Sequence, residues 1–332
     1  MAAGLGTRLK PFTEDSAKAA LPVMGVPMIQ LAIDAASGVG ARDLIVNVHA
    51  HGKAFQQVLG RMDLGGGKIR ISDESKQLLG SAGGVRQALD LLGAGSFVLL
   101  NADTLNDIDL TALVKRHQEL RKSHGVWMTM ALFKESPMPG KYRQMKMDSS
   151  SGLIHGFDPE PKQKVPFFIG TAVVEKEAYD FLPAGKPSEF VPTVLDRLIV
   201  EKKLGFFLSD GIWFDIGSPV LWLQAHQECM RLWNQGRLPM EWKRRFMDAH
   251  VQKVSDRLFI GPIRSQADEK EWQKRLSADI EGFFYLDPAR LTDWTGEDFK
   301  RTTGSVVYQV SAEMIRTNPG KGIGYEDHWV LI

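Results

Sequence analysis

The stretch DLIVNVHAHGKAFQQVLGRMDLGGGKIRIS, residues 43–72, decides the fold of this chain. Its first six residues form an apolar run rich in β-branched side chains, which is typical of a buried strand. Residues 51–62 carry apolar side chains at helical spacing, and residues 68–72 alternate as a strand does. A strand, a helix and a strand in succession predict a parallel pair joined by a crossover helix.

The same alternation continues along the chain. Residues 83–92 and 110–122 have helical patterns, and residues 96–103 and 126–133 have strand patterns. We therefore expect an α/β, Rossmann-like fold, with a mostly parallel sheet and helices on both faces. From about residue 139 the pattern predicts a hairpin over 142–157, a strand over 166–174, a helix over 190–204 and a strand–turn–helix over 213–233. We expect one domain over residues 1–233 and a small C-terminal appendage over 234–332.

Composition excludes several classes of protein. The 332 residues are 43% hydrophobic and 24% charged with a net charge of +1, so no overall field favours nucleic acid or a membrane surface. No apolar run is long enough for a membrane helix, and the first residues do not resemble a signal peptide. The single cysteine, Cys229, provides neither an intrachain disulfide nor a cysteine metal site. These features predict a cytoplasmic protein.

A glycine-rich loop near the start of the chain, AAGLGTRLKPFT (residues 2–13), indicates phosphate binding. It is not a dinucleotide fingerprint, because Leu9 stands where the third glycine belongs, and no ATPase P-loop pattern occurs. Gly4 and Gly6 would let the backbone approach a triphosphate, Arg8 would grip two phosphate oxygens, and Lys18 would add a mobile charge. The alternative is an ordinary surface turn with scattered cations.

Two aspartates follow strand-like segments. Asp103 ends LLNAD just past a buried strand, where open α/β sheets bind ligands, and Asp215 lies in WFDIGSP. Either residue alone could be a turn former or a helix cap, although Asp107 and Asp109 are the better candidates to cap the next helix.

The order A-A-G-x-G-T-R-L-x-P-x-T, then Lys18 and LPV, resembles the sugar-1-phosphate nucleotidyltransferases. NADT, WFDIGSP and LLGSAGGV resemble further motifs of that family, and the resemblance extends to about Trp233. It implies that residues 1–233 are a catalytic domain and that residues 234–332 are an accessory region of unknown role. It also implies catalytic Arg8 and Lys18, a nucleotide site of Ala3, Gly4, Gly6, Thr7, Gly80, Gly83 and Asp103, a sugar site of Lys162, Gly170 and Glu189, and Mg²⁺ bound by Asp103 and Asp215.

Smaller features of these segments have competing interpretations. Ser81 is a plausible N-cap for the helix after LLG, and that role is compatible with nucleotide binding nearby. In the resembled family the LLGSAGGV stretch lies against the nucleobase, and Glu74 could belong to the same base-reading segment. The order of FDPEPKQK, around Lys162, is scrambled relative to the family motif, so an exposed loop is an equal alternative. His49 and His51 lack a third ligand and are better interpreted as structural than as metal ligands.

The resemblance implies an enzyme that joins a nucleoside triphosphate to a sugar 1-phosphate and releases pyrophosphate. The stretch LLGSAGGV is similar both to mannose-1-phosphate guanylyltransferases and to N-acetylmuramate-1-phosphate uridylyltransferases, which leaves the base open, and a guanylyltransferase is the preferred expectation. The alternatives are an N-acetylmuramate-1-phosphate or other sugar uridylyltransferase, another phosphorylated acceptor such as choline phosphate, and a non-catalytic nucleotide-sugar sensor. A dinucleotide oxidoreductase is disfavoured by the broken fingerprint. The sequence leaves a homo-oligomer open.

The chain departs from the resembled family at its start. Members of that family begin with a strand of about six apolar residues before the glycine loop, and Met1 stands at the end of that strand. Either this strand lies upstream of Met1 or the protein lacks it. Because a missing central strand would leave backbone groups unpaired, we expect the first.

Overall fold

The computed structural model describes residues 1–4, 6–10, 12–13, 16–49, 51–136, 143–161 and 165–248. It also describes six short strands: β13 (Gln252–Lys253), β14 (Phe259–Ile260), β15 (Gly282–Phe283), β16 (Val306–Val307), β17 (Ile323–Tyr325) and β18 (His328–Val330). The chain divides into two compact units. The first contains residues 1–4, 32–52 and 62–213, and the second contains residues 5–31, 53–61 and the chain from 214 onward.

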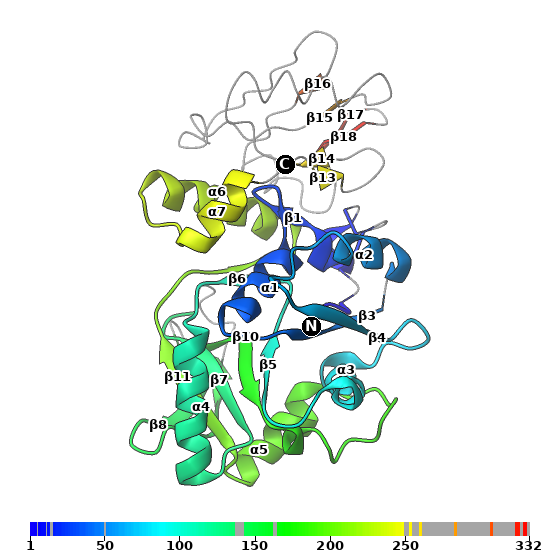
Figure 1. Ribbon diagram of the computed structural model, residues 1–332. Helices are drawn as coiled ribbons and strands as arrows, with labels where there is room; N and C mark the ends of the chain where they lie inside the picture. The colour runs from blue at the N-terminus through cyan, green and yellow to red at the C-terminus, as the bar shows by residue number, and fades with distance from the viewer. Residues whose placement is uncertain are drawn as a thin grey trace. The chain divides into compact units, whose positions relative to one another are not determined.

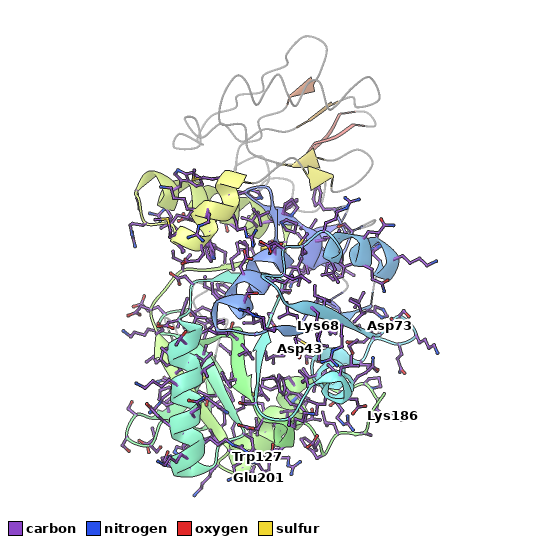
Figure 2. The ribbon with its side chains drawn as sticks, in the orientation of Figure 1. Asp43, Lys68, Asp73, Trp127, Lys186 and Glu201 are labelled. Carbon is purple, nitrogen blue, oxygen red and sulfur yellow. The ribbon has the colours of Figure 1, made fainter. Side chains whose placement is uncertain are left out.

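Residues 43–72 fold as predicted. β3 (Asp43–Val48) and β4 (Lys68–Asp73) are parallel and pair residue for residue, and α2 (Gly52–Leu59) lies between them in the chain. Asp43 is opposite Lys68 at the start of the pair, where the two side chains form an exposed ion pair of 3.2 Å (Figure 2). The prediction of a parallel pair with a crossover helix is confirmed.

A six-stranded sheet forms the centre of the first unit (Figure 1). Its strands lie in the order β5 (Phe97–Leu100), β10 (Phe167–Val174), β7 (Met128–Phe133), β11 (Leu204–Ser209), β9 (Leu153–Pro161) and β8 (Arg143–Asp148). The α/β class is confirmed, but this sheet is mixed rather than mostly parallel, because only β7 and β11 pair in parallel. β8 and β9 form a hairpin and therefore run antiparallel to each other, and β10 pairs antiparallel with both β5 and β7.

Alternate residues of the central strands bury two different cores. Met128 and Met130 of β7 pack with α3 (Gly80–Ala88) and α5 (Asp196–Val200), whereas Ala131 and Phe133 pack with α4 (Leu110–His124). Figure 1 shows α4 lying across the sheet. Asp109 caps α4 by accepting from the backbone N–H of Ala112 at 2.9 Å, as the sequence predicts. Helices therefore cover both faces, because successive side chains of a strand point to opposite sides.

The first residues of the chain lie between two strands of the first unit. The Met1 amino group donates to the Leu100 carbonyl, and Ala102 N–H donates to the Met1 carbonyl at 3.0 Å. On the other side, Ala2 N–H donates to the Asn47 side chain. Within the described residues, β3 pairs only with β4, and β5 is at one end of its sheet. The expected upstream strand stays a prediction.

The second unit holds a short hairpin against a helix. β1 (Pro22–Val23) and β2 (Val26–Pro27) pair, and α6 (Pro219–Asn234) donates from Trp222 Nε1 to the Pro22 carbonyl at 2.8 Å. His226, one turn further along α6, accepts from Met24 N–H at 3.3 Å. Further elements of the chain, not confined to this unit, are α1 (Met28–Gly38), β6 (Thr104–Asn106), β12 (Trp213–Asp215) and α7 (Met240–Asp248). In the described part of the chain, none of the helices combines the length and apolar character that crossing a bilayer requires.

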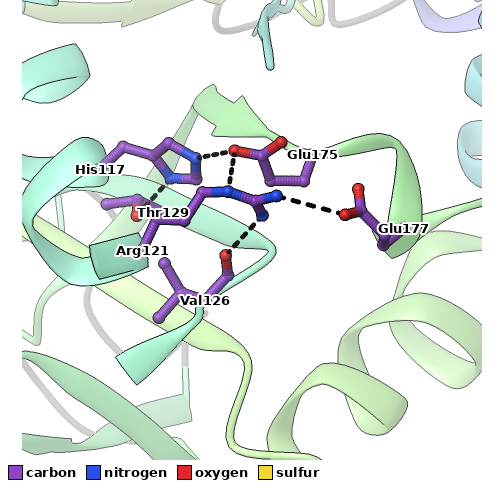
Figure 3. A network of polar contacts seen from close by, with 6 residues as sticks. All are labelled: His117, Arg121, Val126, Thr129, Glu175 and Glu177. Carbon is purple, nitrogen blue, oxygen red and sulfur yellow. Dashed lines mark hydrogen bonds and ion pairs between the residues drawn. The ribbon is translucent and has the colours of Figure 1, made fainter. Parts of the chain in front are cut away.

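A buried polar network ties α4 to the sheet (Figure 3). His117 contacts Thr129 Oγ1 at 2.9 Å through Nδ1 and Glu175 Oε1 at 3.0 Å through Nε2. Because a carboxylate accepts, Nε2 carries the proton and Nδ1 accepts from the Thr129 hydroxyl. Arg121 approaches the same carboxylate at 3.1 Å and also contacts Glu177 at 3.3 Å. Burial lowers the pKa of His117, and this effect exceeds the opposing effect of Glu175.

We expect the stability of the protein to depend on His117. An unfolded histidine takes up a proton near pH 6.5, whereas folded His117 remains neutral to lower pH, so the free energy of unfolding falls as the pH drops below about 6.5. His117→Gln should lower stability at pH 7 by about 1–3 kcal/mol, because buried partners lose hydrogen bonds. It should also weaken the pH dependence between pH 7 and 5, measured by urea unfolding. The same pH dependence in both proteins would contradict this account.

Candidate functional site

The glycine-rich turn of the phosphate loop belongs to the second unit. Gly6 adopts φ +62°, and its carbonyl accepts from Leu9 N–H and from Thr13 Oγ1, both at 2.8 Å. A Cβ at Gly6 would lie 2.9 Å from the Thr13 side chain, so only glycine fits this turn. The turn leads into η1 (Thr7–Leu9), which buries Leu9 and leaves Arg8 exposed. A planar cation held at the surface beside a tight turn suits contact with phosphate.

In the second unit, Arg8 and Asp215 lie beside Gly217, and Lys18 lies beside Asp215. A Cβ on Gly217 would lie 3.0 Å from Arg8 Nη2 and 2.9 Å from Asp215 Oδ1. Lys18, in the short helix η2 (Lys18–Ala20), is largely buried, and its Nζ lies 3.8 Å from Asp215 Oδ1. One carboxylate therefore lies among two cations, which compensates its removal from water.

Gly217 is a site residue that sequence reasoning missed, although it lies in the quoted motif WFDIGSP. Its missing side chain leaves the room that Arg8 and Asp215 occupy. The next residue, Ser218, caps α6 by accepting from Leu221 N–H at 3.3 Å, with Pro219 in the first turn. The motif thus combines a carboxylate, a residue without a side chain and a helix start in five residues.

Asp103 lies in the first unit, just past the end of β5, as predicted. Gly170 is close to the same segment: it adopts φ +83° at an irregularity of β10, and its carbonyl accepts from Asn101 N–H at 2.9 Å. A Cβ on Gly170 would lie 2.6 Å from Asn101 Nδ2. The structure therefore brings Gly170 close to the backbone that carries Asp103.

Asp107, which the sequence offers as a cap for α4, has a different role. Its carboxylate accepts from Ile212 N–H at 2.7 Å, and burial raises its pKa. Asp109 alone caps α4, because it stands directly before the helix.

The prediction that Ser81 caps a helix is wrong. α3 already begins at Gly80, which adopts φ +73°, so Ser81 is inside the first turn. Its hydroxyl instead donates to Glu189 Oε2 at 2.6 Å and accepts from Phe190 N–H at 2.8 Å. Ser81 thereby holds the start of η5 (Phe190–Leu195), a π-helical turn, against α3.

The glycines of α3 pack closely on the segment before Glu189. A Cβ on Gly80 would lie 2.6 Å from Glu189 Oε1, and one on Gly83 would lie 2.5 Å from the carbonyl of Lys186, which Figure 2 labels. The Ser188 carbonyl accepts from Ala82 and Gly83 N–H groups at 2.9 and 3.1 Å. These contacts account for both glycines, and their proposed role at a nucleotide stays a prediction.

The remaining predicted site residues are Ala3, Gly4, Thr7 and Lys162. Ala3 is buried and Gly4 is exposed in the first unit, and Thr7 is exposed in the second. Lys162 lies outside the described residues. His49 Nδ1 donates to the Glu74 carbonyl at 2.7 Å, which agrees with a structural interpretation of that histidine.

Each of the two aspartates, one in the first unit and one in the second, has the chemistry of a ligand for a hard divalent cation. Asp103 is half-buried at a strand end, and Asp215 has a side chain 15% exposed beside Lys18. Carboxylate oxygens are the ligands that Mg²⁺ prefers, with water and phosphate completing its coordination.

The comparison with protein families identifies the class. Residues 1–231 match the family model described as nucleotidyl transferase, and this chain belongs to that family.

Curated relatives agree with this class, and a solved structure shares the fold. The N-acetylmuramate alpha-1-phosphate uridylyltransferase of Neisseria meningitidis is 27% identical over 66% of this chain and 91% of its own length. A probable mannose-1-phosphate guanylyltransferase of Oryza sativa is 27% identical over 71% of this chain. The chain spans only 66% of the length of that relative. The crystal structure of HddC from Yersinia pseudotuberculosis shares the fold, with a TM-score of 0.57, 19% identity, and coverage of 68% of this chain and 96% of that one.

We expect Gly80→Ala to destabilise the protein. A side chain at φ +73° is strained, and its Cβ would meet Glu189. The expected loss is about 1–3 kcal/mol, measured by urea unfolding. Gly93→Ala is the matched control, because nothing lies within 4 Å of the Cβ position there and its φ is not positive. Equal stability of the two variants would refute the packing argument.

Proposed function

We propose that this chain transfers a nucleotidyl group from a nucleoside triphosphate to a sugar 1-phosphate and releases pyrophosphate. The observation that carries the proposal is the cluster of Asp215 with Arg8, beside Gly217, and with Lys18, in the same unit as the glycine turn at Gly6. Two cations and a carboxylate are the groups needed to bind a triphosphate and a metal ion. Membership of the nucleotidyl transferase family supports the same reaction class.

The reaction needs no general base from the protein. An oxygen of the sugar phosphate, already ionised at pH 7, would form a bond to the α-phosphorus while the bond between that phosphorus and the leaving pyrophosphate oxygen breaks. Catalysis of such a transfer rests on positioning and on stabilisation of charge. The described chain supplies charged groups of this kind.

Each residue has a proposed role. Arg8, exposed beside the glycine turn, would hold the departing pyrophosphate with its planar fork. Lys18 would neutralise the α-phosphate while the new bond forms. Asp103 and Asp215 would hold Mg²⁺, which when bound neutralises phosphate charge and aligns the phosphates.

The acceptor side of the site is proposed on fewer contacts. Glu189 would accept hydrogen bonds from sugar hydroxyls, with Ser81 fixing its carboxylate at 2.6 Å. Gly170 would let the sugar approach the backbone. We propose mannose 1-phosphate and GTP as the substrates, because the mannose-1-phosphate guanylyltransferase of Oryza sativa resembles this chain. An N-acetylmuramate 1-phosphate and UTP pair is the alternative, supported by the Neisseria relative.

Pyrophosphate release tests the proposal directly. Purified protein with Mg²⁺ would be given each NTP in turn with a panel of sugar 1-phosphates that includes mannose and N-acetylmuramate. Release with GTP and mannose 1-phosphate is the expected result, and release with UTP would instead select the alternative. No release with any pair would overturn the proposed activity and favour a nucleotide-sugar sensor.

Loss of either aspartate should abolish turnover without unfolding the protein. We expect Asp103→Ala and Asp215→Ala to reduce kcat by about 10²-fold or more, because each removes charge stabilisation from the transition state. Asp210→Ala is a suitable control, since that carboxylate is exposed and pairs with Lys134 on the surface. Turnover retained in Asp103→Ala and Asp215→Ala would contradict the assigned roles.

A further inference from the structure

Two buried polar side chains face each other on neighbouring strands of the first unit. Asn47 is next to the last residue of β3, and Glu74 follows the last residue of β4. Their side chains are 4% and 2% exposed, and Asn47 Nδ2 donates to Glu74 Oε1 at 2.8 Å. A buried carboxylate is costly unless it is fully hydrogen-bonded, so this pair needs an explanation beyond packing.

Each member of the pair also binds the backbone of a glycine-rich stretch. Asn47 Oδ1 accepts from Ala2 N–H at 2.7 Å, at the start of the phosphate loop. Glu74 Oε2 accepts from Leu79 N–H at 3.1 Å, one residue before α3. A continuous relay of three hydrogen bonds therefore connects the backbone at Ala2 with the backbone at Leu79.

Helix α3 lies directly on this relay. A Cβ on Gly84 would lie 2.6 Å from Glu74 Oε1 and 3.1 Å from Asn47 Nδ2. Any side chain at that position would push the pair apart, so Gly84 serves the Asn47–Glu74 contact. The pair thus touches the phosphate-loop start on one side and the glycines of α3 on the other.

We propose that Asn47 and Glu74 are positioning residues for the nucleotide. They hold the Ala2–Gly4 backbone and the Leu79–Gly84 backbone in a fixed relation, so that both stretches are arranged before a triphosphate binds. This inference rests on the proposed function, in which these stretches contact the nucleotide. Preorganised binding segments cost less conformational entropy on association, which gives higher affinity.

The polarity of the relay makes a stringent test possible. The relay ends at two backbone N–H donors, those of Ala2 and Leu79. The side chains at positions 47 and 74 must therefore each accept a hydrogen bond from one of them. Between them, one must donate and the other must accept. One amide and one carboxylate satisfy this requirement in either order, whereas two amides or two carboxylates do not. Asn47→Asp and Glu74→Gln should each break the relay, and the double exchange Asn47→Asp/Glu74→Gln should restore it.

The experiment measures the dissociation constants of GTP and of UTP, each with Mg²⁺, by calorimetry without acceptor. The pH is 8, which disfavours a proton shared between two carboxylates. We expect each single variant to weaken binding of the preferred nucleotide by about tenfold or more, because a buried polar group loses its partner. The double variant should bind within about threefold of wild type.

A matched control separates positioning from general stability. His117→Gln removes a buried polar partner in the same unit, where the His117 side chain contacts Thr129 and Glu175. It should lower the melting temperature while leaving the nucleotide dissociation constant unchanged. Single variants at 47 and 74 that lose melting temperature but bind nucleotide as His117→Gln does would overturn the inference. So would a double variant that binds no better than the single ones.

Failure of the inference and failure of the proposed function give different results. If wild type binds GTP or UTP but releases no pyrophosphate with any acceptor, the proposed reaction fails and the comparison of dissociation constants still decides the role of the pair. If wild type binds neither nucleotide, the GTP and UTP assignments fail, and the inference that Asn47 and Glu74 position these nucleotides fails with them.

Discussion

The burial of β7 on both faces is the constraint on which the first unit depends. All six residues of this strand are buried, and it pairs with β10 on one side and β11 on the other. Because its alternate residues point to opposite faces, the strand can be desolvated only if helices cover both sides. α3 and α5 meet this need on one face and α4 on the other.

The strands and helices whose pattern is local were predictable from the sequence. β3 coincides with the predicted residues 43–48, and the pattern over 110–122 foretold most of α4. The direction of β10 was not predictable, because side-chain alternation does not say which neighbour a strand pairs with. The cap role of Ser81 failed for a similar reason: its true partner, Glu189, lies 108 residues away in the chain.

Prediction of the site was limited in the same way. The motif around Asp215 predicted the carboxylate. The role of Gly217 was not predictable, because it depends on contact with Arg8, which is distant in the sequence. Glu74 was associated with the base-reading stretch from its place in the sequence. Glu74 is only 2% exposed and accepts a hydrogen bond from Asn47. A carboxylate in this position is suited to hold the backbone of the stretch, and it is not free to contact solvent or a ligand.

The different exposure of Arg8 and Lys18 has a consequence for behaviour in salt. Dissolved ions screen a charge only where they can approach it. In ordinary buffers the electrostatic field of such a charge decays over about 8–10 Å. Arg8 is exposed and open to this screening, whereas the Lys18 and Asp215 side chains are 10% and 15% exposed and largely shielded from it. Raising the ionic strength would therefore weaken the long-range attraction between Arg8 and an approaching anion. Lys18 and Asp215 keep their mutual attraction at salt concentrations that screen the charges on the surface.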